Sequence, residues 1–141
     1  MGLDMYLTAS KFLFDYKDKD EKKKLKKIFN QEINEVKFEV GYWRKANAIH
    51  KWFVDNVQKG ADNCGTYYVN RDDLIKLKEL CEQILKHNSL ASELLPTQEG
   101  FFFGSYEYDE YYFTDLENTI KIIDKCLELN EEYDIEYHSS W

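Results

Sequence analysis

The stretch from Tyr42 to Val57 constrains the fold more than any other part of the chain, because it combines regular apolar spacing with a polar flank. Its sequence is YWRKANAIHKWFVDNV. At helical spacing, one apolar stripe contains Tyr42, Ala46, Ile49, Phe53 and Val57. The stripe beside it contains Trp43, Asn47, His50 and Val54. The pattern predicts a core-facing helix whose amide and imidazole groups either satisfy the core or line a pocket.

The remaining apolar patterns predict a single α+β domain. The chain has 141 residues, of which 43% are hydrophobic and 33% charged, a composition typical of globular rather than disordered proteins. Alternating side chains predict strands at 3–7, 66–69 and 133–137. Helical spacing predicts one helix after Asn70 and another beginning at Thr114 or Asp115. We expect one domain over residues 1–141, with about three helices packed on a small, mainly antiparallel sheet.

Three further segments carry weaker patterns. The segment 36–41 fits either a strand or the first turns of a longer helix. The lysine-rich run 20–30 predicts a short, charged helix that Leu25, Ile28 and Phe29 anchor to the rest of the chain. Two glycines flank the phenylalanines at 101–103, which predicts a short buried strand between turns.

The charge pattern argues against nucleic acid as a partner, and the hydropathy pattern argues against membrane contact. The net charge is −8, and residues 99–141 alone carry twelve acidic and only two basic side chains. Such a surface repels phosphate backbones, so no direct contact with nucleic acid is expected. No apolar run approaches the roughly 18 residues that span a bilayer, and the N-terminal residues lack the pattern of a secretory signal. We therefore expect a cytoplasmic protein with no membrane contact.

The cysteines and histidines predict neither disulfides nor a metal site. Cys81 and Cys126 fall on apolar helical faces, and Cys64 lies in a polar loop, so reduced thiols are expected. Cys81 is interpreted as a small core residue rather than a nucleophile. No two Cys or His residues have the close spacing of zinc ligands, and neither a metal nor a cofactor is assigned.

Most of the chain carries a family resemblance. The segments concerned are Gly2–Leu7 (GLDMYL), Tyr42–Val57, Leu94–Thr97 with Gly100–Ser105, Tyr108–Glu110 and Ser139–Trp141. On these segments the chain resembles a family of small proteins encoded by bacteriophages and by prophages in bacterial chromosomes. The resemblance implies a setting inside a bacterial host, where small phage accessory proteins commonly bind and block host components. It implies no particular reaction, and it does not extend to residues 17–32.

The aromatic and polar residues near these segments favour binding of a small nucleotide-like ligand. Aromatic residues make up 16% of the chain. Their rings stack on bases with about 1–3 kcal/mol each, and Arg or Lys can meet a phosphate. The candidate ligand-binding residues are Trp43, Arg44, Asn47, His50, Lys51, Thr97, Phe103, Ser105 and Asp109. The leading hypothesis is a non-enzymatic, phage-type cytosolic protein that sequesters such a ligand, for example a host defence signal.

Two alternative functions stay open at the level of sequence. The first is an inhibitor that binds a host protein, or imitates nucleic-acid phosphates, through an acidic aromatic surface containing Glu107, Asp109, Glu110, Asp115 and Glu117. The second is a small hydrolase with His50 as general base, oriented by Asp109 or Glu110. The nucleophile-elbow, phosphate-loop and HExxH motifs are missing from the sequence, so no catalytic residue is assigned. The sequence does not determine the oligomeric state, and a homo-oligomer is compatible with it.

Overall fold

The computed structural model describes residues 2–100 and 103–141, and these residues form an antiparallel sheet with five α-helices. The strands are β1 (Asp4–Phe12), β2 (Glu35–Arg44), β3 (Thr66–Tyr68) and β4 (Asp134–Ser140). The helices are α1 (Lys19–Phe29), α2 (Asn47–Asn56), α3 (Arg71–Lys86), α4 (Ala91–Leu94) and α5 (Glu110–Glu128), with a 3₁₀ turn, η1, at Asn88–Leu90. The α+β class and the antiparallel sheet are confirmed. The expectation of about three helices is wrong, since the described residues form five.

The four strands lie in the order β2-β1-β4-β3, and every neighbouring pair is antiparallel. Alternation along β1 places Met5, Leu7 and Ala9 on the buried face, while Tyr6 and Thr8 are only partly buried. Tyr137 of β4 lies opposite Leu7 and is fully buried on the same face. The N-terminal strand is therefore longer than the predicted 3–7, and the C-terminal strand runs beyond the predicted 133–137.

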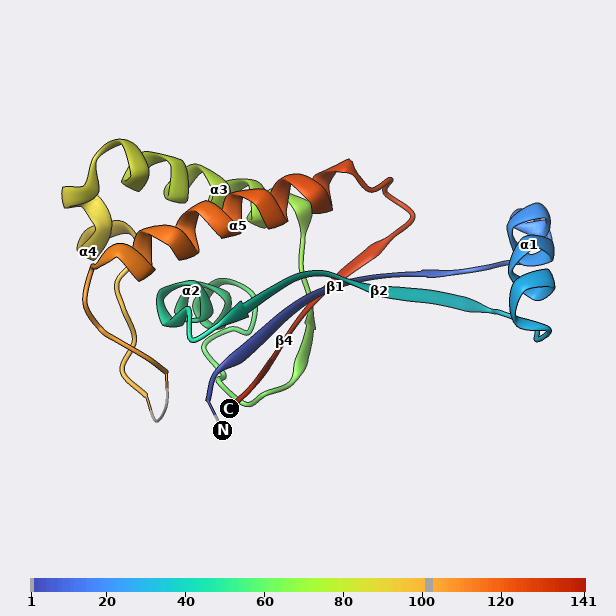
Figure 1. Cartoon of the computed structure of the whole chain (residues 1–141), viewed down its shortest axis with the longest axis horizontal. Helices are drawn as coiled ribbons and strands as arrows, with labels where there is room; N and C mark the ends of the chain where they lie inside the picture. Colours follow the sequence, from blue (N-terminus) through green and yellow to red (C-terminus); the bar gives the residue numbers. More distant parts are fainter. Residues whose placement is uncertain (1, 101–102) are drawn as a thin grey trace.

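Helices α2 and α5 pack on the buried face of the sheet, and α3 packs alongside α5 (Figure 1). The ring of Phe53 in α2 stacks on Tyr137 with centroids 3.9 Å apart. Gly41 in β2 allows the closest approach of α5, because a Cβ atom at this position would lie 2.2 Å from a methyl carbon of Ile122. The core therefore lies between the sheet and these helices.

Helix α1 lies apart from this core. Strands β1 and β2 extend from the body as a two-stranded ribbon, and α1 sits at the far end of it (Figure 1). No residue of α1 is buried, and Ile28 and Phe29 are 70% and 60% exposed. The charged helix at 20–30 is thus confirmed within a residue at each end. Its expected anchoring by Leu25, Ile28 and Phe29 is wrong, because the ribbon carries the helix away from the body.

The predicted continuous helix from Tyr42 to Val57 is wrong. Tyr42 and Trp43 belong to β2, whose bounds also settle the segment 36–41 as strand, and α2 begins only at Asn47. The backbone turns at Lys45, which has a φ angle of 56°. Alternation in the strand sends Trp43 into the core and leaves Tyr42 41% exposed. Of the apolar stripe predicted at helical spacing, only the part that starts at the N-cap Ala46 belongs to a helix.

The other segments follow their predicted types with shifted bounds. Helix α3 begins after Asn70 as expected, and Cys81 lies in its buried face. Burial raises the pKa of the Cys81 thiol to about 12, as expected for a core residue. Helix α5 begins at Glu110, well before the predicted Thr114 or Asp115. Residues 101 and 102 of the predicted short strand lie outside the described residues, and Phe103 is buried without being part of a strand. Among the described helices, none is both long and apolar enough to cross a membrane.

Candidate functional site

A cleft of about 320 Å³ lies where the β2–α2 turn, residues 97 and 104–109 and the start of α5 meet. Ligand pockets in proteins commonly measure about 300–1,000 Å³, so this cleft has room for one small molecule. Five of the residues predicted to bind ligand line it, namely Arg44, Asn47, Thr97, Ser105 and Asp109. The walls come from segments that are far apart in the sequence and that the fold brings together.

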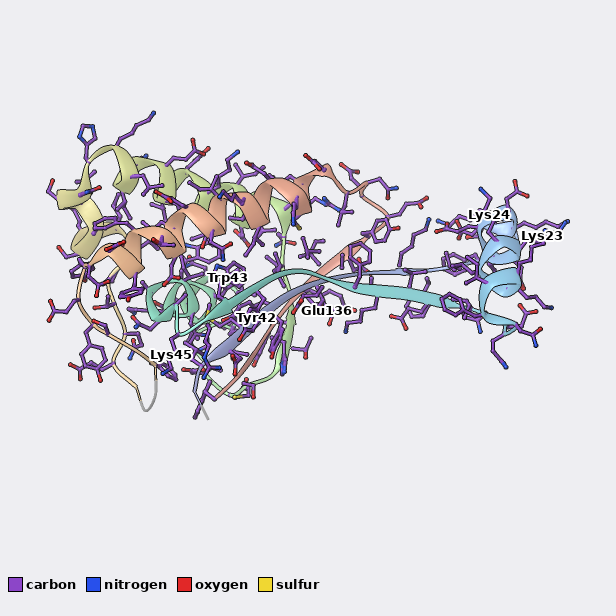
Figure 2. All side chains as sticks on the ribbon, in the orientation of Figure 1. Lys23, Lys24, Tyr42, Trp43, Lys45 and Glu136 are labelled. Atoms are coloured by element: carbon purple, nitrogen blue, oxygen red, sulfur yellow. The ribbon has the colours of Figure 1, made fainter. Side chains whose placement is uncertain are left out.

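Charges of both signs line the cleft. Arg44 and Lys45 lie at the end of β2 closest to α2, where Figure 2 labels Lys45. Three carboxyl groups lie across from this turn, at Glu107, Asp109 and Asp115. The guanidinium of Arg44 donates to Asp4 Oδ1 at 2.8 Å, yet half of its side chain stays exposed. The arrangement suits a ligand that carries an anionic group and several hydrogen-bond donors.

Asp115 is the most perturbed of the three carboxyl groups. Burial, and second to it the negative charge of Asp109, raise the pKa of Asp115 from 3.8 to about 7. No hydrogen bond or ion pair stabilises its charged form among the residues that the structure describes. A carboxyl group with such a pKa exchanges its proton near neutral pH, so it can both donate and accept a hydrogen bond within the cleft.

Asn47 holds the loop that forms one wall of the cleft. Its side-chain nitrogen donates to the carbonyl oxygens of Phe103 at 3.1 Å and Ser105 at 2.8 Å. Its side-chain oxygen accepts from the backbone N–H of Gln98 at 2.9 Å. The residue is buried, and three of its hydrogen-bonding positions are occupied by loop backbone. Asn47 therefore shapes the cleft, and it has little capacity left for a ligand.

The backbone of the cleft is held in an uncommon conformation at Lys45 and Gly104. Both residues have positive φ angles, 56° and 91°. Lys45 is anchored there by two backbone bonds, since its N–H donates to Leu3 and its carbonyl accepts from Asn47. A Cβ atom on Gly104 would lie 3.0 Å from the Cβ of Lys45. The two turns thus touch, and only glycine fits at 104 without strain.

The other predicted cleft residues make local bonds that order the loop. Asp109 is the N-cap of α5 and accepts from the N–H of Tyr112 at 3.1 Å. The hydroxyl of Thr97 donates to the carbonyl of Tyr106 at 2.9 Å. The hydroxyl of Ser105 accepts from the N–H of Glu107 at 3.0 Å. Ser105 is exposed and keeps a proton to donate, so it can also contact a ligand.

Four predicted ligand-binding residues lie outside the cleft. The indole of Trp43 is buried and donates to the hydroxyl of Thr119 at 2.9 Å, so Trp43 is a core residue (Figure 2). The side chain of Lys51 forms an ion pair with Asp55, one turn further along α2, at 2.8 Å. The third and fourth, His50 and Phe103, pack edge to face in a separate cluster with ring centroids 5.5 Å apart.

His50 is a buried, fully bonded histidine. Its Nε2 lies 2.9 Å from Asp62 Oδ1, and its Nδ1 lies 2.7 Å from the hydroxyl of Tyr137. Burial lowers the pKa of His50 against the opposing effect of Asp62, so the ring is neutral near neutral pH. A carboxylate only accepts, hence Nε2 carries the proton and Nδ1 accepts from Tyr137. Asp109 and Glu110 do not orient this ring, which removes the geometry that a general base at His50 was expected to have.

Sequence reasoning missed Lys45 as a cleft residue and placed Asp115 only on the acidic aromatic surface of the alternative, protein-binding function. A signal for Asp115 exists in the sequence, because it lies three residues after Tyr112 and four before Thr119, both buried in α5. That spacing places the carboxyl group beside the buried face of the helix. No such signal exists for Lys45, since a lysine does not indicate a turn with positive φ.

The cleft as a whole can bind a small polar anion and exchange a proton with it. Two cationic side chains reach its rim, a carboxyl group with a pKa near 7 lies in its wall, and hydroxyl groups line the loop. Comparison with protein-family models, with curated proteins and with solved structures found no match to this chain.

Proposed function

We propose that this protein is a phage-type, cytosolic, non-enzymatic binding protein that holds one small nucleotide-like anion in the cleft between the β2–α2 turn and α5. The observation that carries the proposal is the meeting of Arg44 and Lys45 with Asp115 in one cleft. The cations suit a phosphate group, and Asp115 and Asp109 suit ribose hydroxyl or amino groups of a base.

The origin of the cleft walls supports this proposal. The β2–α2 turn, the loop with Thr97 and Ser105, and the N-cap Asp109 all belong to segments on which the phage-family resemblance rests. The volume of about 320 Å³ fits a single small ligand better than a dinucleotide. We therefore expect a mononucleotide-sized ligand rather than a polymer.

Native mass spectrometry of the purified protein, compared with its denatured mass, tests whether a ligand is carried through purification. Calorimetric titration with AMP, adenosine and inorganic phosphate then separates recognition of the base from recognition of the phosphate. We expect AMP to bind more tightly than either fragment. Lys45→Gln should weaken AMP binding, whereas Lys51→Gln, which removes the same charge outside the cleft, should not. A ligand-free native mass together with no binding of any of the three compounds would contradict the proposal.

A second candidate function is binding of a host protein through the rim of the same cleft. Tyr111 is 80% exposed at the rim, and the neighbouring Glu110 and the cleft residue Glu107 are exposed as well. Tyrosine is enriched at interface hot spots, and an acidic rim suits a basic partner. Pull-down from host lysate with wild type and Tyr111→Ala distinguishes this function, because the small-ligand proposal requires no captured protein.

A further inference from the structure

The outer edge of β2 has no partner strand. Strand β2 is at one end of the sheet and pairs only with β1. Its segment Glu35–Glu39 lies on the ribbon between the body and α1, where Figure 1 shows no other element along this edge. An exposed edge of this length presents free backbone N–H and C=O groups and readily pairs with another strand. The described part of the chain supplies no such strand.

The sequence of this edge is complementary to itself in an antiparallel pair. With a two-fold axis at Phe38, Lys37 of one copy faces Glu39 of the other, and each charge pair occurs twice. Phe38, which is 38% exposed, then faces its own copy. An axis at Lys37 would instead place Glu35 against Glu39 and Lys37 against itself. Charge therefore disfavours the axis at Lys37. An axis at Val36 would also pair Lys37 with Glu35 of the other copy, but it lies one residue from the start of β2 and pairs only Glu35–Lys37 within the strand. Charge and the length of paired strand together favour the register centred on Phe38.

Lys37 and Glu39 have no charged partner among the residues that the structure describes. Their neighbours on β1 are Ser10 and Thr8, which are neutral. Both side chains are exposed, and neither forms an ion pair among residues 2–100 and 103–141. The alternating charges on β2 are thus free to meet a second strand.

We propose that the protein forms a symmetric dimer in which the β2 edges of two copies pair antiparallel about Phe38, joining the two sheets into one. This inference does not depend on the proposed ligand. Because the pairing is antiparallel, the α1 end of each ribbon lies toward the body of the other copy. Helix α1, with six lysines and two acidic residues, is thereby brought close to the body of its partner, where residues 99–141 carry twelve acidic side chains. The dimer thus supplies a partner for helix α1, none of whose residues is buried in its own chain.

Light scattering coupled to size-exclusion chromatography, over a dilution series, tests this dimer. Wild type should show twice the mass of the chain, with dissociation on dilution. Lys37→Glu and Glu39→Lys each place like charges opposite one another at two symmetric positions. Each should raise the dissociation constant of the dimer about tenfold or more. The double exchange K37E/E39K restores opposite charges and should restore the dimer.

Lys86→Glu is the matched control, because it makes the same charge change at an exposed position on α3, away from β2. It should leave the dissociation constant unchanged, and circular dichroism confirms that every variant is folded. A wild type that is monomeric throughout the series would overturn the proposal. So would a dimer that both single variants leave intact, or one that the double exchange fails to restore, since these results place the interface elsewhere.

Discussion

The carboxyl groups of Asp109 and Asp115 share one cleft, and the charge of Asp109 adds to burial in raising the pKa of Asp115 to about 7. The two carboxyl groups have different roles. Asp109 caps α5 through the N–H of Tyr112 and is needed there as an acceptor. The side chain of Asp115 accepts no such bond among the described residues, and its surroundings favour the protonated, uncharged form. Ionisation of Asp115 therefore lowers the stability of the folded protein, and a ligand that donates a hydrogen bond to the carboxylate would offset this loss.

Asp115→Asn should stabilise the free protein in a manner that depends on pH. The folded chain binds the proton of Asp115 more tightly than the unfolded chain, whose pKa lies near 3.8. The free energy of unfolding therefore falls as pH rises from about 4 to 7, and the full penalty is present above that range. We expect the variant to be about 1–3 kcal/mol more stable than wild type near pH 8, and no more stable near pH 4.

Urea unfolding at both pH values measures this difference. Asp134→Asn, at an exposed position where β4 begins, is the control and should show no comparable gain at the higher pH. An equal effect of Asp115→Asn at both pH values would show that its carboxyl group is not perturbed in the folded state.

Binding of an anionic ligand should weaken as pH rises through about 7. An ionised Asp115 in the same cleft repels a phosphate held by Arg44 and Lys45, whereas the protonated form carries no charge and does not. We expect the affinity for AMP to fall by about tenfold between pH 6 and 8 in wild type, which corresponds to about 1.4 kcal/mol. The affinity of Asp115→Asn should change much less over the same range. Adenosine serves as the control ligand, and an equal pH dependence for adenosine would assign the effect to something other than the phosphate.

Asn47→Ala should loosen the loop that forms the cleft wall. The change removes three hydrogen bonds and leaves the carbonyls of Phe103 and Ser105 without their donor. Because the site is buried, we expect a loss of about 2–4 kcal/mol of stability. Limited proteolysis should also cleave the loop that Asn47 holds faster in the variant than in wild type. Asn56→Ala removes a single bond to the carbonyl of Trp52 at an exposed position, and it should cost about 1 kcal/mol or less.

The sequence predicts element types well and the geometry of the cleft in part. Apolar alternation and helical spacing identify β1 and β4, the two central strands of the sheet, and the helix after Asn70, since these patterns follow directly from which side chains meet the core. The prediction of one helix from Tyr42 is wrong because three residues fit helical spacing without being helical. Tyr42 and Trp43 belong to β2, and Ala46 lies in the turn before α2. The chain turns between the two elements at Lys45, which has a positive φ, and at Ala46, and a lysine carries no sign of such a turn.

The roles of the predicted site residues depend on tertiary contacts that spacing does not reveal. The polar flank of the helix was expected either to satisfy the core or to line a pocket, and the structure contains both cases. Asn47 lines the cleft, and its amide group is hydrogen-bonded to the backbone of the loop. His50 is buried and hydrogen-bonded to Asp62 and Tyr137. Asp62 lies in a polar loop twelve residues away, and nothing in its neighbours marks it as a partner of the histidine.

The burial of His50 should make the protein sensitive to mild acid. Burial lowers the pKa of His50 below 6.5, so the unfolded chain binds a proton at pH values where the folded chain does not. The free energy of unfolding should therefore fall as pH decreases below about 6.5. His50→Gln should flatten this part of the profile. His87→Gln, at the exposed end of α3, should leave the profile as in wild type, and an unchanged profile in His50→Gln would assign the acid sensitivity to another group.

Gly104→Ala should test whether the contact between the two cleft turns is required for folding. Gly104 and Gly60 have similar φ angles, 91° and 83°, so an alanine at either position pays a similar backbone cost of about 1 kcal/mol. Only at 104 does the new methyl group meet a neighbour, at 3.0 Å from the Cβ of Lys45 and 3.2 Å from its carbonyl oxygen, while nothing lies within 4 Å of it at 60. Lys45 is held by backbone bonds and cannot easily withdraw. We therefore expect Gly104→Ala to lose about 1–3 kcal/mol more stability than Gly60→Ala in urea unfolding, and to weaken AMP binding where Gly60→Ala does not. Equal losses for the two variants would mean that the turns move apart at little cost, and that their contact does not set the shape of the cleft.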